Sequence, residues 1–228
     1  MDFPGLPARL ALVRETVARS QAARGWRHTV RIVGVTKTHG PEAVQAAVSA
    51  GLQDVGENRV QEALQKQQSL AALSVDWHLI GTLQRNKARN AVGRFALIHS
   101  VDRLDLAAEL DRRSVEGTRQ RVLVQVNCSA EPQKGGVSPE SLPGLLDQLQ
   151  TLNRLEVQGL MTMSALTDDP AEQRRSFRLL RELREAAERS GHRLPDLSMG
   201  MSGDYAIAVE EGATMIRLGT VLFGERET

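Results

Sequence analysis

The sequence predicts an α/β fold, a single (β/α)8 TIM barrel with an extra N-terminal helix before its first strand. The chain has 228 residues, a length that suits one α/β barrel. Eight short apolar runs alternate with longer segments of helical periodicity, which indicates parallel strands joined by helical crossovers. The alternative is an open, doubly wound sheet. It usually has a G-x-G-x-x-G turn after its first strand, where this chain has Thr38-His39-Gly40-Pro41.

The expected strands are short runs of apolar and β-branched residues at 31–38, 54–58, 76–81, 95–101, 122–128, 157–163, 197–201 and 215–223. The expected helices have apolar residues every three or four positions and cover 6–22, 41–50, 60–69, 106–115, 142–152, 171–190 and 205–211. Glycines after several helices and prolines at the start of others are typical helix boundaries. We therefore expect one domain at 1–228, with the N-terminal helix within 1–30 and the barrel at 31–224.

Composition limits the classes of partner and the compartment. A net charge of +1 and 3% aromatic residues give no argument for nucleic-acid binding. No window approaches the roughly 18 consecutive apolar residues of a membrane span, and the N-terminus shows no signal peptide. The single cysteine, Cys128, cannot form an intrachain disulfide, so a cytoplasmic location is the simplest interpretation. Its spacing from His78 does not fit a zinc site, and we expect no metal.

Polar residues and glycines gather at the ends of the expected strands, where barrels carry their chemistry. Strand alternation places Arg217 on the interior face of the last strand, with Met215. In the first strand, Lys37 shares a face with Val33 and Val35, although this strand alone does not decide which face is inside. If that face is the inner one, the amine of Lys37 lies at the mouth of the barrel.

The loops after the last two expected strands predict a phosphate site. Ser202 supplies a hydroxyl just before a helix start at Tyr205, and Gly219-Thr220 allows an anion to approach the main chain closely. The alternative is that Ser202 and Asp204 are ordinary N-cap residues. The two loops lie next to each other in a barrel, which favours phosphate binding.

A lysine and a phosphate site at one rim suggest two chemistries that both need a desolvated amine. One is a Schiff-base aldolase acting on a sugar phosphate, and the other is pyridoxal phosphate (PLP) held on the lysine. Arg217 favours PLP, because a permanently charged guanidinium facing a pyridine nitrogen would keep that nitrogen unprotonated. The inward lysine and acidic residues that an aldolase requires are not evident.

Several sequence blocks resemble the YggS/PROSC family of PLP homeostasis proteins. They follow one order along roughly 32–226 and read VTKT at 35–38, GENRVQE at 56–62, WHLIG at 77–81, LQxNK at 83–87, HSxD at 99–102, VNxSxExxKxG at 126–136, GLM at 159–161, LSMGMSxD at 197–204 and RxGTxxFG at 217–224. The resemblance implies a barrel similar to the N-terminal domain of alanine racemase, with a role in homeostasis of the cofactor. Ala165 departs from the pattern, where we would expect a proline, in a loop that is peripheral to the site.

The resemblance also assigns roles to residues of this chain. Lys37 would carry PLP as a Schiff base, and Arg217 would face the pyridine nitrogen. The phosphate would lie against Ser202, Gly219 and Thr220. Asn58 would lie beside the ring.

A racemase of this fold type needs a second acid/base, which a tyrosine of an added β-domain supplies. This chain ends soon after the last expected strand and has one tyrosine, Tyr205. We therefore expect a PLP carrier or regulator that is not an enzyme, with a fold-type-III amino-acid racemase as the alternative. The expected partners are PLP and PLP-requiring apo-enzymes, and the expected state is a monomer.

Three further residues admit two interpretations each. His78 and His99 are either acid/base groups or hydrogen-bonded structural residues, and the second is favoured. Lys134, in a glycine-rich loop, is either a second amine near the rim or a solvated loop lysine, and again the second is favoured.

Overall fold

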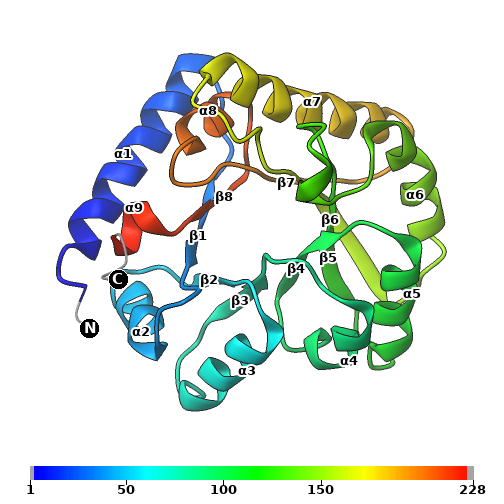
Figure 1. Cartoon of the computed structure of the whole chain (residues 1–228), viewed down its shortest axis with the longest axis horizontal. Helices are drawn as coiled ribbons and strands as arrows, with labels where there is room; N and C mark the ends of the chain where they lie inside the picture. The colour runs from blue at the N-terminus through cyan, green and yellow to red at the C-terminus, as the bar shows by residue number, and fades with distance from the viewer. Residues whose placement is uncertain (1–2, 225–228) are drawn as a thin grey trace.

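The computed structural model describes residues 3–224, and its eight parallel strands close into a barrel in sequence order (Figure 1). The strands are β1 (Arg31–Val35), β2 (Asp54–Glu57), β3 (Asp76–Leu79), β4 (Leu97–Val101), β5 (Gln120–Gln125), β6 (Leu155–Met161), β7 (Asp196–Ser198) and β8 (Met215–Leu218). The closing pair is β8 with β1, in which Leu218 lies opposite Gly34. The predicted (β/α)8 barrel is confirmed.

Helices form the outer layer around the strands (Figure 1). They are α1 (Leu6–Arg24), α2 (Pro41–Ser49), α3 (Val60–Ser69), α4 (Ala88–Ala91), α5 (Leu104–Arg113), α6 (Leu142–Leu149), α7 (Pro170–Arg189), α8 (Tyr205–Glu210) and α9 (Thr220–Phe223). The sequence did not predict α4, because four residues are too few to show a helical period. No helix within the described range 3–224 has the length and apolar character needed to cross a membrane.

The extra N-terminal helix, α1, packs against α8 and α9. Its buried residues include Leu6, Leu10, Val13 and Val17, whose spacing of four and three residues forms one stripe on a helix. The Nε of Arg9 donates to the carbonyl oxygen of Leu222 in α9 at 2.6 Å. The helix therefore covers the elements on either side of β8, as Figure 1 shows.

Two apolar cores hold the barrel. The larger one lies between strands and helices, and a smaller one fills the barrel with Val33, Leu97, Leu123, Met161 and Met215. Val33 therefore identifies the inner face of β1, which the sequence had left open. Met215 confirms the inward face predicted for β8, on which Arg217 follows.

All but one of the predicted strands run past their observed ends, the exception being the run that ends at Val101. The chain leaves the extended conformation where polar residues and glycines begin. The rim of the barrel is thus built from turns rather than strand ends, and this is where the candidate site lies.

Candidate functional site

Lys37 lies just beyond β1, in the turn that leads to α2. The predicted strand to 38 is wrong in its last residues, because β1 ends at Val35 and Thr38 has a positive φ of 69°, which extended backbone does not adopt. The side chain of Lys37 is exposed, which differs from the desolvated amine that the sequence led us to expect. It lines a pocket of about 320 Å³ together with Gly219 and Thr220. Two of the predicted phosphate residues therefore share a pocket with the predicted lysine.

Ser202 lies between β7 and α8 and contacts the start of α9. Its Oγ accepts hydrogen bonds from the N–H groups of Gly219 and Val221, each at 3.3 Å. The predicted strand at 215–223 is wrong beyond Leu218. Gly219 has φ −108° and ψ −86°, which breaks the extended backbone, and α9 begins at Thr220. The sequence of α9, TVLF, looks like a strand because two of its four residues are β-branched.

Asp204 occupies the N-cap position of α8, but it does not cap the helix with its side chain. Instead, its Oδ1 accepts from the N–H of Met201 at 2.5 Å, and its Oδ2 accepts from the hydroxyl of Ser164 at 2.5 Å. The alternative interpretation of Ser202 and Asp204 as ordinary N-caps is therefore wrong. Asp204 holds the turn that presents Ser202 to α9.

Arg217 lies inside the barrel on β8 and is only 4% exposed. Its Nη1 donates to Ser198 Oγ at 2.7 Å, and its Nη2 donates to the carbonyl oxygen of Thr162 at 3.0 Å. Burial lowers the pKa of Arg217 to about 10, against the attraction of Asp204, so the group stays charged at neutral pH. A guanidinium has five N–H donors, and these two bonds leave donors for a ligand.

Asn58 directly follows β2 and lies level with Lys37, because the strand register pairs Val35 with Gly56. Its backbone packs against Gly81, where an added Cβ would lie 2.3 Å from the carbonyl oxygen of Asn58. Only glycine allows this approach. The close contact keeps Asn58 at the rim on the strand next to Lys37.

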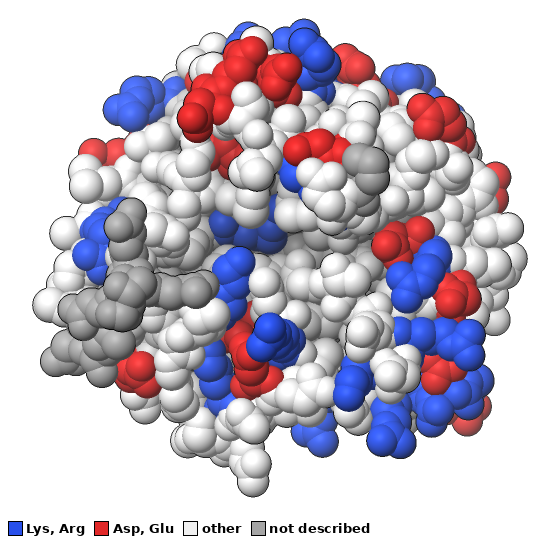
Figure 2. Space-filling view, in the orientation of Figure 1, with Lys and Arg blue, Asp and Glu red and all other residues white. Residues whose placement is uncertain are grey.

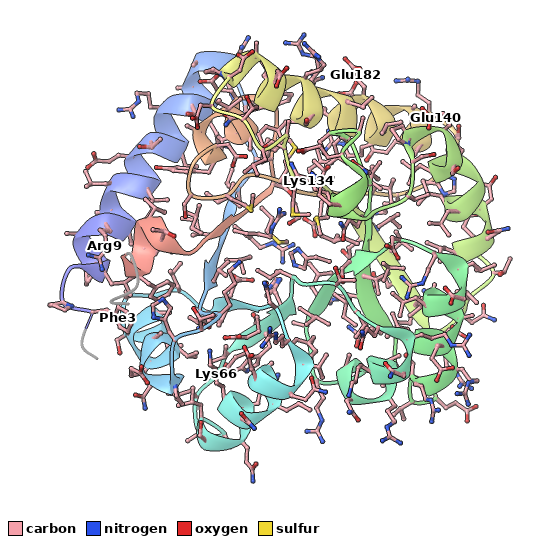
Figure 3. All side chains as sticks on the ribbon, in the orientation of Figure 1. Phe3, Arg9, Lys66, Lys134, Glu140 and Glu182 are labelled. Atoms are coloured by element: carbon pink, nitrogen blue, oxygen red, sulfur yellow. The ribbon has the colours of Figure 1, made fainter. Side chains whose placement is uncertain are left out.

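A buried ion pair between Lys66 and Glu57 lies beneath the Lys37 turn and was not predicted from the sequence. The Nζ of Lys66 donates to Glu57 Oε1 at 2.6 Å and to the carbonyl oxygen of Thr36 at 2.8 Å. The hydroxyl of Thr36 donates to the same Glu57 oxygen at 2.6 Å. Lys66 projects from α3 (Figure 3), and Thr36 directly precedes Lys37. Alternation along β2 could have placed Glu57 facing the helices, but nothing in the sequence identifies its partner.

Lys134 is engaged rather than solvated, so the favoured interpretation of it as a solvated loop lysine is wrong. Its Nζ contacts the carbonyl oxygen of Ser164 and the carboxylate of Glu131, and the hydrogen bond from Lys134 lowers the pKa of Glu131. Glu131 also accepts from the N–H of Leu166 at 3.2 Å. These contacts join the loops that follow β5 and β6, and Figure 3 shows Lys134 inside the ring of helices.

His78 and His99 are hydrogen-bonded to each other inside the barrel, with 2.9 Å between His78 Nδ1 and His99 Nε2.

Cys128 packs against the larger apolar core, between strands and helices, and burial raises the pKa of its thiol to about 12. Within residues 3–224, no group of three or more His, Cys, Asp and Glu side chains is placed to hold a metal ion.

The face seen in Figure 2 is hollowed near its centre, and atoms of basic side chains are visible in and beside the hollow. The described residues supply an exposed amine on Lys37, a Ser202 hydroxyl that accepts from two main-chain N–H groups and keeps its own hydrogen to donate, and a buried cation on Arg217. Such a set can hold an anionic group, present a nucleophile to a carbonyl, and donate a hydrogen bond to a lone pair.

A comparison with known families matches the alanine racemase N-terminal domain to residues 13–227. The pyridoxal phosphate homeostasis protein of Aquifex aeolicus is 44% identical over 223 residues, which cover 96% of this chain and 97% of that protein. Its counterpart in Pseudomonas aeruginosa is 43% identical over 218 residues, which cover 95% and 92% respectively.

Solved structures agree with these matches. PipY of Synechococcus elongatus, solved with PLP bound, has a TM-score of 0.85 at 39% identity and covers 96% of this chain and 100% of its own. Alanine racemase of Clostridium difficile has a TM-score of 0.73 at 16% identity, over 97% of this chain and 57% of its own; this likeness concerns the fold alone. The chain belongs to the pyridoxal phosphate homeostasis protein family, within the group that shares the alanine racemase N-terminal domain.

Proposed function

We propose that this chain binds PLP as a Schiff base on Lys37 and serves in PLP homeostasis without a turnover reaction of its own. The sequence has four lysines, and the observation that carries the proposal is where each of them lies in the structure. Lys37 alone among them lines the pocket that Gly219 and Thr220 also line. The structure describes no hydrogen bond or ion pair for its amine among residues 3–224, so the amine is available for a carbonyl carbon.

The other lysines are unsuitable for different reasons. Lys66 is buried and paired with Glu57 at 2.6 Å. Lys134 is bound to a carbonyl oxygen and a carboxylate. Lys87 ends the short helical turn Arg85–Lys87 and is absent from the pocket of Lys37.

The residues around the pocket fit the remaining groups of the cofactor. Ser202 Oγ accepts from the N–H groups of Gly219 and Val221, so the hydroxyl of Ser202 keeps its own hydrogen to donate. With the Thr220 hydroxyl it can hold a phosphate, to which the N–H of Gly219 would turn from Ser202. Arg217 has donors left for a pyridine nitrogen and cannot give that nitrogen a proton. Asn58, level with Lys37, would lie beside the ring. The bound cofactor would supply an aldehyde and a nitrogen heterocycle that withdraws electrons.

The role of carrier fits the position of Tyr205, the one tyrosine of the chain. Tyr205 packs against the core between strands and helices, which leaves its phenol badly placed to act as a second acid/base above the pocket. The related proteins of Aquifex and Pseudomonas are named for homeostasis rather than for a reaction. A Schiff base on an exposed lysine can be reversed by water or by another amine. We therefore propose that a monomer releases PLP to PLP-requiring apo-enzymes.

The proposal is tested by adding PLP to the purified protein and following the absorption band of the imine. The wild-type chain should develop the band, Lys37→Ala should not, and the control Lys87→Ala should behave like wild type. Lys37→Ala should still bind PLP weakly, with competition by inorganic phosphate, because the phosphate residues remain. A band that survives in Lys37→Ala would refute the assignment.

An assay for interconversion of amino-acid enantiomers at PLP saturation separates the carrier from the racemase alternative. Turnover that depends on Lys37 would establish the racemase and contradict the carrier. Complete failure of the wild-type chain to form the imine band would favour the aldolase alternative.

A further inference from the structure

A chain of five hydrogen-bonded side chains crosses the barrel interior from β2 to β8. Asp54 Oδ1 lies 2.9 Å from His78 Nε2, and His78 Nδ1 lies 2.9 Å from His99 Nε2. His99 Nδ1 lies 3.0 Å from Ser198 Oγ, which accepts from Arg217 at 2.7 Å. His78, His99, Ser198 and Arg217 are all buried. The site described above uses only the last of these five residues.

The end of the chain at Arg217 determines the direction of its hydrogen bonds. A guanidinium only donates, so Ser198 Oγ accepts from Arg217 and still has its own hydrogen to donate. Within residues 3–224, the structure gives the Ser198 hydroxyl no hydrogen-bond neighbour besides Arg217 and His99. The hydroxyl therefore donates to Nδ1 of His99, because a buried donor without an acceptor is costly.

The other end requires the same direction. The carboxylate of Asp54 only accepts, so His78 carries its hydrogen on Nε2. If both imidazoles are neutral, His99 Nε2–H donates to His78 Nδ1, and every group in the chain has a partner. The alternative makes His78 an imidazolium that donates to His99. It leaves the Ser198 hydroxyl without an acceptor and adds a second cation near Arg217.

Other charges near these hydrogen-bonded side chains agree with neutral imidazoles on His78 and His99. Burial lowers the pKa of His99 well below its ordinary value, and His78, Arg217 and Arg31 lower it further. Asp54 and His78 open onto a small polar pocket of about 80 Å³, which Arg31 and Asp76 also line. The series of hydrogen-bonded side chains from Asp54 to Arg217 therefore joins the cofactor side of the barrel to a polar pocket on the opposite side.

We propose that Ser198, His99 and His78 are positioning residues that anchor the buried guanidinium of Arg217, with both imidazoles neutral and protonated on Nε2. The anchor holds Nη1 of Arg217 against β7, while Nη2 donates to the carbonyl oxygen of Thr162. The remaining N–H donors of the guanidinium are left to meet the pyridine nitrogen of PLP. The part that concerns PLP rests on the proposed function, whereas the tautomers of the imidazoles do not.

The first test needs no cofactor. Long-range ¹H–¹⁵N correlation spectra of the ¹⁵N-labelled protein at neutral pH distinguish the two neutral tautomers and the imidazolium, and His78→Gln and His99→Gln assign the signals. Both His78 and His99 should be neutral with hydrogen on Nε2. An imidazolium at either position, or hydrogen on Nδ1 of either ring, would overturn the proposal, including its extension to PLP.

The second test measures the anchor through the cofactor. Ser198→Ala should weaken PLP binding about tenfold, because a hydrogen bond to a charged group is lost, and should shift the imine absorption band. The control Ser114→Ala removes another buried serine, whose hydroxyl donates to the carbonyl oxygen of Leu110 at 2.9 Å far from the chain. It should leave both readouts unchanged.

The outcomes separate the two levels of the proposal. If Ser198→Ala binds PLP within twofold of the wild type with the same band, the positioning role is wrong. If the wild-type protein forms no imine band at all, the proposed function fails, and the tautomer spectra alone decide whether the hydrogen-bonded chain is as described.

Discussion

Two buried cations near the rim, Lys66 and Arg217, are held in opposite ways. They are 7% and 4% exposed. Lys66 meets the carboxylate of Glu57 at 2.6 Å on the outer side of the barrel wall. Arg217, inside the barrel, is bound by the Ser198 hydroxyl and a main-chain carbonyl oxygen. No carboxylate within residues 3–224 makes a salt bridge to it at 4.0 Å or less.

The difference indicates what each cation is for. The charge of Lys66 is neutralised by Glu57, so Lys66 holds the wall and the turn before Lys37 and has nothing to offer a ligand. Arg217 keeps its charge against neutral acceptors, at the cost of burial that lowers its pKa to about 10. A cation retained in this way suits a ligand that brings a lone pair. Three experiments test this distinction, and a fourth, Gly81→Ala, tests the rim beside Lys37.

The largest effect on stability should come from Lys66→Ala. The substitution leaves the buried carboxylate of Glu57 unpaired, and removal of one partner of a buried ion pair typically costs about 3–5 kcal/mol. Urea unfolding should measure this loss. The double variant Glu57→Leu/Lys66→Met should recover most of it, because an apolar pair leaves no orphaned charge. A loss below about 1 kcal/mol in Lys66→Ala would contradict the structural role.

Arg217→Met should cost less stability, about 1–3 kcal/mol, because only two neutral acceptors lose a partner. It should reduce PLP binding far more than Lys66→Ala does, when the two are compared under conditions where both are folded. If urea unfolding shows that Arg217→Met loses more stability than Lys66→Ala, the distinction between the two cations is wrong.

Gly81→Ala should cost about 1–3 kcal/mol by overpacking. The new Cβ would lie 2.3 Å from the carbonyl oxygen of Asn58, so the rim beside Lys37 must shift. Gly144→Ala is a matched control, because nothing lies within 4 Å of a Cβ there and alanine favours its helix, α6. Unfolding curves should show a loss for the first variant and a small gain for the second. Equal stabilities would mean that the backbone contact at Asn58 is not tight.

The pH dependence of stability reports the neutral imidazole next to Arg217. Burial lowers the pKa of His99 below its ordinary value of 6.5, so below pH 6.5 the unfolded chain takes up a proton that the folded chain does not. Stability should therefore fall as the pH drops below 6.5, by up to about 1.4 kcal/mol per pH unit from this group. His99→Gln should have a shallower slope over the same range. An identical slope would contradict the lowered pKa, because it would show that His99 takes up its proton equally in the folded and the unfolded chain.

Much of the barrel could be predicted because its signals are local. Apolar alternation identified the eight strands and the inward face of Arg217, and the spacing of Leu6, Leu10, Val13 and Val17 identified α1. The rim was less predictable. Thr220-Val221-Leu222-Phe223 has the composition of a strand, and only the backbone turn at Gly219 makes it a helix.

Contacts between distant residues set the rest of the site. Glu57 and Lys66 are nine positions apart, but they lie on different elements, a strand and a helix. His99 and Ser198 are 99 positions apart. No periodic pattern indicates which polar residues face each other across a closed barrel, so the residues that support Lys37 and Arg217 emerged only from the structure.

The most direct test of the central claim is chemical trapping of the cofactor. The protein is loaded with PLP, reduced with borohydride, and digested for peptide mass mapping across its four lysines. The pyridoxyl group should be found on Lys37, with Lys66, Lys87 and Lys134 unmodified. An adduct on any of these three with Lys37 unmodified would contradict the account.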